Sequence, residues 1–194
     1  MTPRGNILPL MFSKLSVVLI TLAATLPSLH ADWKYSVNRY DLRVASTEAA
    51  GTSPDGPIAT RVVVQHSPAK DGTISIEFIV EGARKRKGFG YDAFEGPDAP
   101  AAGAKLTRIV VERPGAKPLT LLTKVGGWYL NDAFHFAATE TNARPGAILD
   151  AVRAMQSGAA KVSVNVQDSK TDKVQLHAEF ATAGAADALA KLLK

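Results

Sequence analysis

Apolar and polar residues alternate along much of the chain after residue 32, which is typical of β-strands with one buried face. The clearest case is the segment 73–80, where Ile74, Ile76, Phe78 and Val80 alternate with Thr, Ser and Glu. The same pattern predicts further strands at residues 58–65, 106–112, 119–125, 128–130, 134–138, 162–166 and 174–180.

The alternation from Trp33 to Val37 and from Tyr40 to Val44 differs in phase, so we expect two strand pieces joined by a β-bulge near Asn38 and Arg39. Two segments lack any alternation. Residues 46–57 (STEAAGTSPDGP) and 95–104 (EGPDAPAAGA) are rich in small residues, Gly and Pro. Both are therefore predicted to be loops.

Two segments have helical periodicity. Pro145 suits a first helical turn, one apolar face runs from Ile148 to Met155, and Gly158 is a suitable C-terminal cap. A short last helix is predicted at 186–193. Since strands come first and dominate, we predict a mainly β fold: an antiparallel β-sandwich with one mid-chain helix and a short C-terminal helix.

The first 31 residues differ from the rest of the chain. They contain no acidic residue, and an uncharged apolar run at 16–26 is followed by the helix breaker Pro27. This pattern predicts a secretory signal peptide at 1–31, and the run is too short for a transmembrane helix of about 20 residues. Met11 opens a segment that is a complete signal by itself, so a start at Met11 is an alternative. An uncleaved anchor is another.

Composition narrows the class of protein. Removing 31 of the 194 residues leaves 163, which suits a single domain at 32–194, and 21 cations against 18 acids leave a net charge of +3. That mild charge gives no case for nucleic acid. The absence of cysteine excludes disulfides, thiol chemistry and the usual lipoprotein anchor. We therefore expect a periplasmic or secreted protein, with no transmembrane segment once the signal is removed.

A run of four cations is the densest charge in the chain: Arg84, Lys85, Arg86 and Lys87. As a binding site it would hold an anion such as lipopolysaccharide or an anionic lipid headgroup, and Phe89 and Tyr91 would insert at the lipid interface. The alternative is structural. Neighbouring cations in a strand point to opposite faces, and charges protect an edge strand from aggregation. Phe89 and Tyr91 would then belong to the core of the next strand.

A second candidate is Trp128 with Tyr129, which follow Gly126 and Gly127. The pair is suited to lining a groove for a protein partner. A core tryptophan at the start of a strand is the competing explanation.

Catalytic and metal motifs are missing from the sequence. His66, His135 and His177 have no metal-ligand spacing, and the chain has no GxSxG motif. We predict no cofactor and no metal. A glycosidase-type carboxylate pair, which sequence alone does not identify, would make the chain a periplasmic hydrolase or carbohydrate-active enzyme. A small-lipid carrier is a further alternative, with an apolar cavity lined by residues such as Ile76, Phe78 and Leu121.

The order of signal peptide, early Trp33, β-rich middle, helix, hairpin and final Ala/Leu helix resembles the invasion-associated locus B family of bacterial envelope proteins. The similar text is residues 133–193, ending in EFATAGAADALAKLL. Family members usually carry cysteines in the region matching 134–146, and this chain has none. The resemblance implies a non-catalytic exported protein linked to host-cell contact or envelope stress.

Overall fold

The computed structural model describes residues 32–68, 72–86, 90–140, 142 and 144–194. Within these ranges it has strands β1 (Lys34–Val37), β2 (Arg43–Ser53), β3 (Gly56–Ser67), β4 (Thr73–Val80), β5 (Thr107–Glu112), β6 (Leu119–Leu121), β7 (Lys124–Leu130), β8 (Ala133–Thr139), β9 (Lys161–Gln167) and β10 (Val174–Ala181). Its helices are α1 (Ala99–Leu106), α2 (Ala147–Gln156) and α3 (Ala185–Leu192), with short 3₁₀ turns at Ala83–Lys85 and Tyr91–Phe94.

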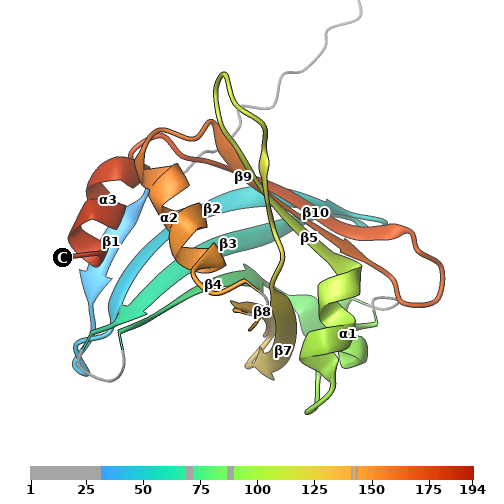
Figure 1. The fold of residues 1–194 in the computed structure, drawn as a ribbon. Coiled ribbons are helices and arrows are strands. Elements are labelled where there is room, and N and C mark those ends of the chain that lie inside the picture. Colours follow the sequence, from blue (N-terminus) through green and yellow to red (C-terminus); the bar gives the residue numbers. More distant parts are fainter. Residues whose placement is uncertain (1–31, 69–71, 87–89, 141, 143) are drawn as a thin grey trace, which may run out of the picture.

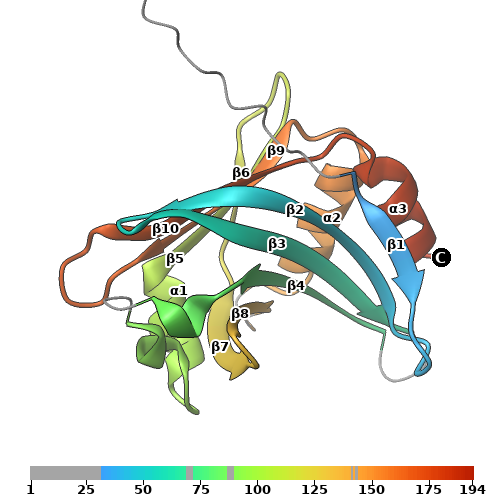
Figure 2. The same cartoon turned by 180° about the vertical axis from the view of Figure 1, so that it is seen from behind.

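The strands form one antiparallel sheet in the order β6-β5-β9-β10-β2-β3-β4-β8-β7, with β1 beside β2. The sheet curls into a trough, and helix α2 lies in its hollow while α3 lies beside β1 (Figures 1 and 2). Only Leu122 and Thr123 connect β6 to β7, although these strands end the order on opposite sides. The two edges of the curled sheet therefore approach each other at this connection.

The mainly β, antiparallel class predicted from the sequence is confirmed. The predicted sandwich is not confirmed, because the strands form one curled sheet instead of two sheets packed face to face. Strands β2 and β3 pair along their whole length, so the sheet continues unbroken between its two halves. Helices, instead of a second sheet, then bury the inner face.

The prediction of a loop at 46–57 was wrong, because most of this segment forms β2 and its hairpin with β3. Ala45, Thr47, Ala49 and Gly51 are buried on alternate positions of β2, so the strand period is present but carried by small side chains. Close packing explains their size. A Cβ on Gly51 would lie 3.1 Å from the His177 carbonyl oxygen of β10.

The β-bulge predicted near Asn38 and Arg39 was also wrong, because a turn here makes β1 and β2 antiparallel partners, with Val37 opposite Arg43. The side-chain oxygen of Asn38 accepts hydrogen bonds from the backbone N–H groups of Tyr40 (2.8 Å) and Leu42 (3.0 Å). An asparagine that bonds the backbone two residues ahead is a turn signal.

Part of the loop predicted at 95–104 is helix α1, which begins with proline near its first turn. The helix packs against β7 so closely that a Cβ on Gly103 would lie 1.9 Å from the carbonyl oxygen of Val125. In the sequence this glycine indicates a loop. In the structure its lack of a side chain allows the helix to pack closely against the strand.

The two predicted helices are confirmed as α2 and α3. Helix α2 ends in a Schellman motif at Gly158, whose φ is 98°: Gly158 N–H donates to Met155 O, and Ala159 N–H donates to Ala154 O at 3.1 Å. The apolar face of α2, including Ile148, Val152 and Met155, is fully buried in the main core. None of the helices in the described ranges is long and apolar enough to cross a membrane.

Candidate functional site: a basic and aromatic corner of the sheet

The described cations of the run, Arg84 to Arg86, do not lie on a strand, although the structural alternative placed them on one. Arg84 and Lys85 belong to the 3₁₀ turn Ala83–Lys85, which follows β4 through Gly82, whose φ is 65°. Arg84 and Lys85 contact the β7–β8 turn, and Arg86 contacts the β2–β3 hairpin. Lys87 and Phe89 lie outside the described residues.

Arg84 contacts the β7–β8 hairpin in two ways. Its Nε donates to the carbonyl oxygen of Asn131 at 2.6 Å, and its guanidinium lies 4.3 Å from the centre of the Tyr129 ring. Lys85 reaches the same turn, because its Nζ lies 3.0 Å from a carboxylate oxygen of Asp132. Two neighbouring cations thus hold one turn.

Arg86 is hydrogen-bonded to a different segment, the β2–β3 hairpin. Its guanidinium donates to the hydroxyl of Ser53 at 2.8 Å and to the carbonyl oxygen of Pro57 at 2.5 Å. These oxygens are neutral, as is the Asn131 carbonyl that Arg84 contacts, so these bonds bring no negative charge to either arginine.

The two sites predicted separately from the sequence therefore meet. We call Arg84, Lys85, Arg86, Trp128, Tyr129 and Leu130 the basic and aromatic corner. Trp128 and Leu130 are 44% and 53% exposed, which is high for large apolar side chains. Contiguous exposed apolar side chains mark interaction sites in soluble proteins, whereas scattered ones are ordinary.

Tyr91 belongs to the core behind this corner and is only 4% exposed. It lies on the 3₁₀ turn Tyr91–Phe94 instead of the predicted strand, and its ring contacts those of Tyr129 and Phe134. Burial raises the pKa of Tyr91 to about 12 and also raises the pKa of Tyr129. The exposed anchor role that the sequence suggested for Tyr91 does not fit this burial.

Trp128 has an unusual support on the outer face of the sheet. Its indole stacks on the imidazole of His135, with ring centres 5.4 Å apart and planes 17° from parallel. The Nδ1 of His135 is hydrogen-bonded to Glu77, and the other oxygen of that carboxylate accepts a hydrogen bond from Gln65 Nε2 at 2.8 Å. Four strands, β7, β8, β4 and β3, contribute one member each.

The strand register explains this cluster. Trp128 lies directly opposite His135, while Glu77 lies opposite Ala137, one outward position further along β8. Outward residues two positions apart on paired strands are diagonal neighbours. Alternation with Phe134 and Phe136 puts His135 on the outward side of the strand predicted at 134–138. The sequence did not show the pairing of β4 with β8, so the partner Glu77 was missed.

Glu77 and His135 are 6% and 9% exposed, although they lie on the outer face. They are flanked there by a small apolar cluster of Val63, Ile79 and Ala133. The side chains directly next to His135 on this face, Ile79 and Trp128, offer no hydroxyl for a Ser-His-acid arrangement. The pair therefore fits a supporting role better than a nucleophile's base.

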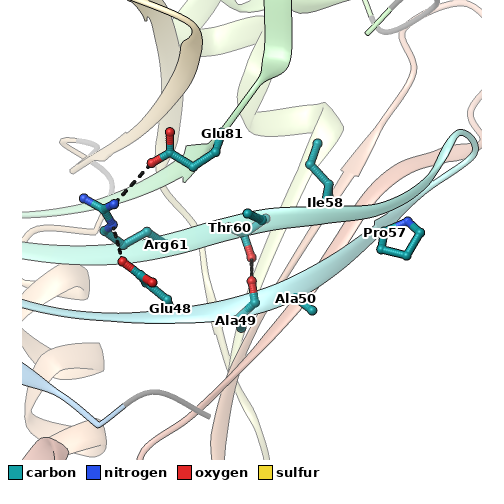
Figure 3. Close-up of a pocket in the computed structure, with 9 residues that line it drawn as sticks. Glu48, Ala49, Ala50, Pro57, Ile58, Thr60, Arg61 and Glu81 are labelled. Carbon is teal, nitrogen blue, oxygen red and sulfur yellow. Dashed lines mark hydrogen bonds and ion pairs between the residues drawn. The ribbon is translucent and has the colours of Figure 1, made fainter. Parts of the chain in front are cut away.

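A second feature of the outer face is a pocket of about 430 Å³ along β2 and β3. Figure 3 shows Arg61 on its rim between two carboxylates, with its nitrogens 3.3 Å from both Glu48 and Glu81. The carboxylate side chains are 61% and 43% exposed. A water-poor cleft with two carboxyl groups would have favoured the hydrolase alternative, whereas this arrangement is an exposed ion-pair network.

The lipid-carrier alternative required an open interior. Ile76 and Phe78 are at most 1% exposed, and the Phe78 ring packs against Phe180 with centres 5.9 Å apart. Side chains therefore fill the trough around these residues. In the part of the chain that the structure describes, no group of three or more His, Cys, Asp or Glu side chains could hold a metal ion.

No family model, curated protein or solved structure matches this chain. Function is therefore inferred from the geometry of the corner and from the sequence.

Proposed function

We propose that the chain is an exported, non-catalytic protein of the bacterial envelope that binds an anionic envelope component through the basic and aromatic corner. The supporting observation is that Arg84 donates to the carbonyl oxygen of Asn131, 47 positions away, which holds the cationic turn against the β7–β8 hairpin that carries the exposed Trp128 and Leu130. Cations beside exposed Trp and Leu are the combination that suits an anionic amphiphilic surface.

The charges of the corner suit this role unequally. Arg84 and Arg86 already have structural partners, and their bonds go to neutral oxygens. The side chain of Lys85 is 81% exposed, and its ion pair with Asp132 is at the surface. Exposed ion pairs contribute about 0–1 kcal/mol, so a phosphate can replace Asp132 at little cost.

Neighbouring carboxylates set a limit on this attraction. Asp55 and Glu81 line an open depression together with Lys85 and Arg86. A simple monovalent anion gains little there, because both signs of charge lie within one depression. A surface with many phosphates and apolar groups gains more, since it can contact the cations and the exposed side chains together.

Export supports the same conclusion. The signal-like segment 1–31 and the resemblance to the invasion-associated locus B family both favour the periplasm or the outside of the cell, and a role in envelope stress or host-cell contact. Lipopolysaccharide and anionic phospholipid headgroups are the anions available in those compartments.

The test is co-sedimentation of the purified protein with phosphatidylglycerol vesicles, phosphatidylcholine vesicles and lipopolysaccharide across a salt series. The corner variant carries Arg84→Gln and Lys85→Ser. The matched control carries Lys34→Ser and Arg39→Gln, two exposed cations at the β1–β2 end. Each cation near an anionic surface contributes about 1 kcal/mol, so we expect the corner variant alone to bind roughly thirtyfold more weakly.

Binding that salt weakens and only the corner variant loses supports the proposal. Absence of binding at low salt, or equal loss in both double variants, overturns it. Circular dichroism of each variant separates loss of binding from loss of fold.

A further inference from the structure

Trp128 stacks on its cross-strand neighbour on the outer face of the sheet. The imidazole of His135, which is part of that face, is nearly parallel to the indole at 17°. One face of the indole is therefore covered. Trp128 is still 44% exposed, although His135 covers one face of its ring.

The imidazole that stacks on the indole is held in place by hydrogen bonds. His135 is held by Glu77, and Glu77 is held in turn by Gln65 at 2.8 Å. Buried polar side chains whose hydrogen bonds are satisfied by one another make the structure around them rigid and fix one arrangement. Gln65, Glu77 and His135 are thus positioning residues for Trp128.

The orientation of the ring indicates what it can bind. An indole that has one face covered by a neighbouring ring and is still 44% exposed can offer its other π face to a ligand. That face carries partial negative charge. The axial C–H groups of a pyranose ring are weakly positive and form a flat apolar surface that matches it.

We propose that Trp128 is a stacking platform for a sugar ring, so that the component bound at the corner is an anionic glycan or glycolipid instead of a plain phospholipid. This inference depends on the proposed function, because the cations of the corner would hold the phosphates or carboxylates of the same molecule.

The probe is the delipidated core oligosaccharide of lipopolysaccharide, followed by the indole N–H signals in ¹H–¹⁵N spectra. The chain has two tryptophans, and Trp33 is an internal control because it is buried and its Nε1 donates to Ala181 O at 2.9 Å. We expect the oligosaccharide to shift the Trp128 signal and leave the Trp33 signal in place.

The variants separate stacking from apolar contact. Trp128→Leu keeps an apolar side chain without a flat ring and should bind the oligosaccharide about two- to tenfold more weakly, the loss expected for one aromatic contact. Trp128→Phe should recover part of the affinity. His135→Ala should also weaken binding, while the control Val174→Ser, at an exposed apolar position of β10 outside the corner, should bind as the wild type does.

Two results would overturn the inference: an unshifted Trp128 signal, or a Trp128→Leu variant with unchanged affinity. If phosphatidylglycerol vesicles then still bind through Arg84 and Lys85, the proposed function stands and only the sugar platform fails. If vesicles and lipopolysaccharide also fail to bind, both proposals fail.

Discussion

Two places in the sheet, the β1–β2 end and the end with the basic and aromatic corner, can be compared. Each carries an exposed aromatic residue and an arginine over a tyrosine ring. At the β1–β2 turn, Arg39 lies 4.8 Å from the ring centre of its neighbour Tyr40, which is 69% exposed. At the basic and aromatic corner, Arg84 lies 4.3 Å from the ring of Tyr129, which is distant in sequence. The same pair of residue types is local at one end and long-range at the other.

The difference lies in what holds each pair. The β1–β2 turn depends on hydrogen bonds from residues within four positions of Asn38. The corner depends on the ring contact of Tyr129 with Tyr91 and on the carbonyl of Asn131. Similar chemistry becomes a preorganised surface only where distant segments fix it. A local pair of the same type remains an ordinary turn.

The largest expected effect is at the support of Trp128. His135→Ala leaves the carboxylate of Glu77 buried without its main partner, and breaking such a pair costs about 3–5 kcal/mol. The double variant Glu77→Leu/His135→Leu should recover most of that loss, since apolar residues of similar volume replace buried pairs at little cost. Urea unfolding measures both. Equal instability of the single and double variants would contradict this account of the pair.

The next effect concerns the close packing of α1 against β7. Gly103→Ala places a Cβ against the Val125 carbonyl, so helix and strand must separate, at a cost of about 1–3 kcal/mol. Hydrogen exchange should show lost protection in β7 and none lost in β1. The control Ala101→Ser, at an exposed position of the same helix, should change stability by less than about 0.5 kcal/mol. Uniform loss of protection in both strands would show that the ends are not independent.

A third effect depends on pH. Burial raises the pKa of Tyr91 from 10.0 to about 12, so the folded state favours the neutral phenol. Its stabilising contribution is complete below about pH 10 and is lost as the pH rises through 12. We expect the wild type to lose about 1–2 kcal/mol more than Tyr91→Phe over that interval. Tyr40→Phe, at the exposed turn, should follow the wild type, and parallel curves for all three proteins would contradict the burial argument.

Alternation in the sequence predicted most of the strands, because large β-branched and aromatic side chains make the inward positions of β4 and β8 obvious. It failed for β2, where Ala45, Ala49 and Gly51 occupy the inward positions. The small residues there allow close packing against β10. In the sequence, a segment rich in small residues, Gly and Pro is instead predicted to be a loop. Helix α1 was missed for the same reason at Gly103.

The candidate site was visible in the sequence only as two parts. The charge of 84–87 and the aromatic pair at 128–129 both stand out. Their union depends on contacts between Arg84 and the β7–β8 turn, which no local pattern encodes. Glu77 was predicted to face solvent between core residues. It does lie on the outer face, but the pairing of β4 with β8 buries it against His135.

The smallest effect compares the two arginines directly. Arg84→Gln removes a hydrogen bond to Asn131 and a contact with Tyr129, which together contribute about 1 kcal/mol at an exposed site. Arg39→Gln removes only a contact between exposed neighbours and should cost less than about 0.5 kcal/mol. Thermal unfolding of the two variants at matched salt measures the difference. If the two variants lost the same stability, the hydrogen bond between Arg84 and Asn131 would add nothing beyond an arginine–tyrosine contact. The contrast between the two ends would then disappear.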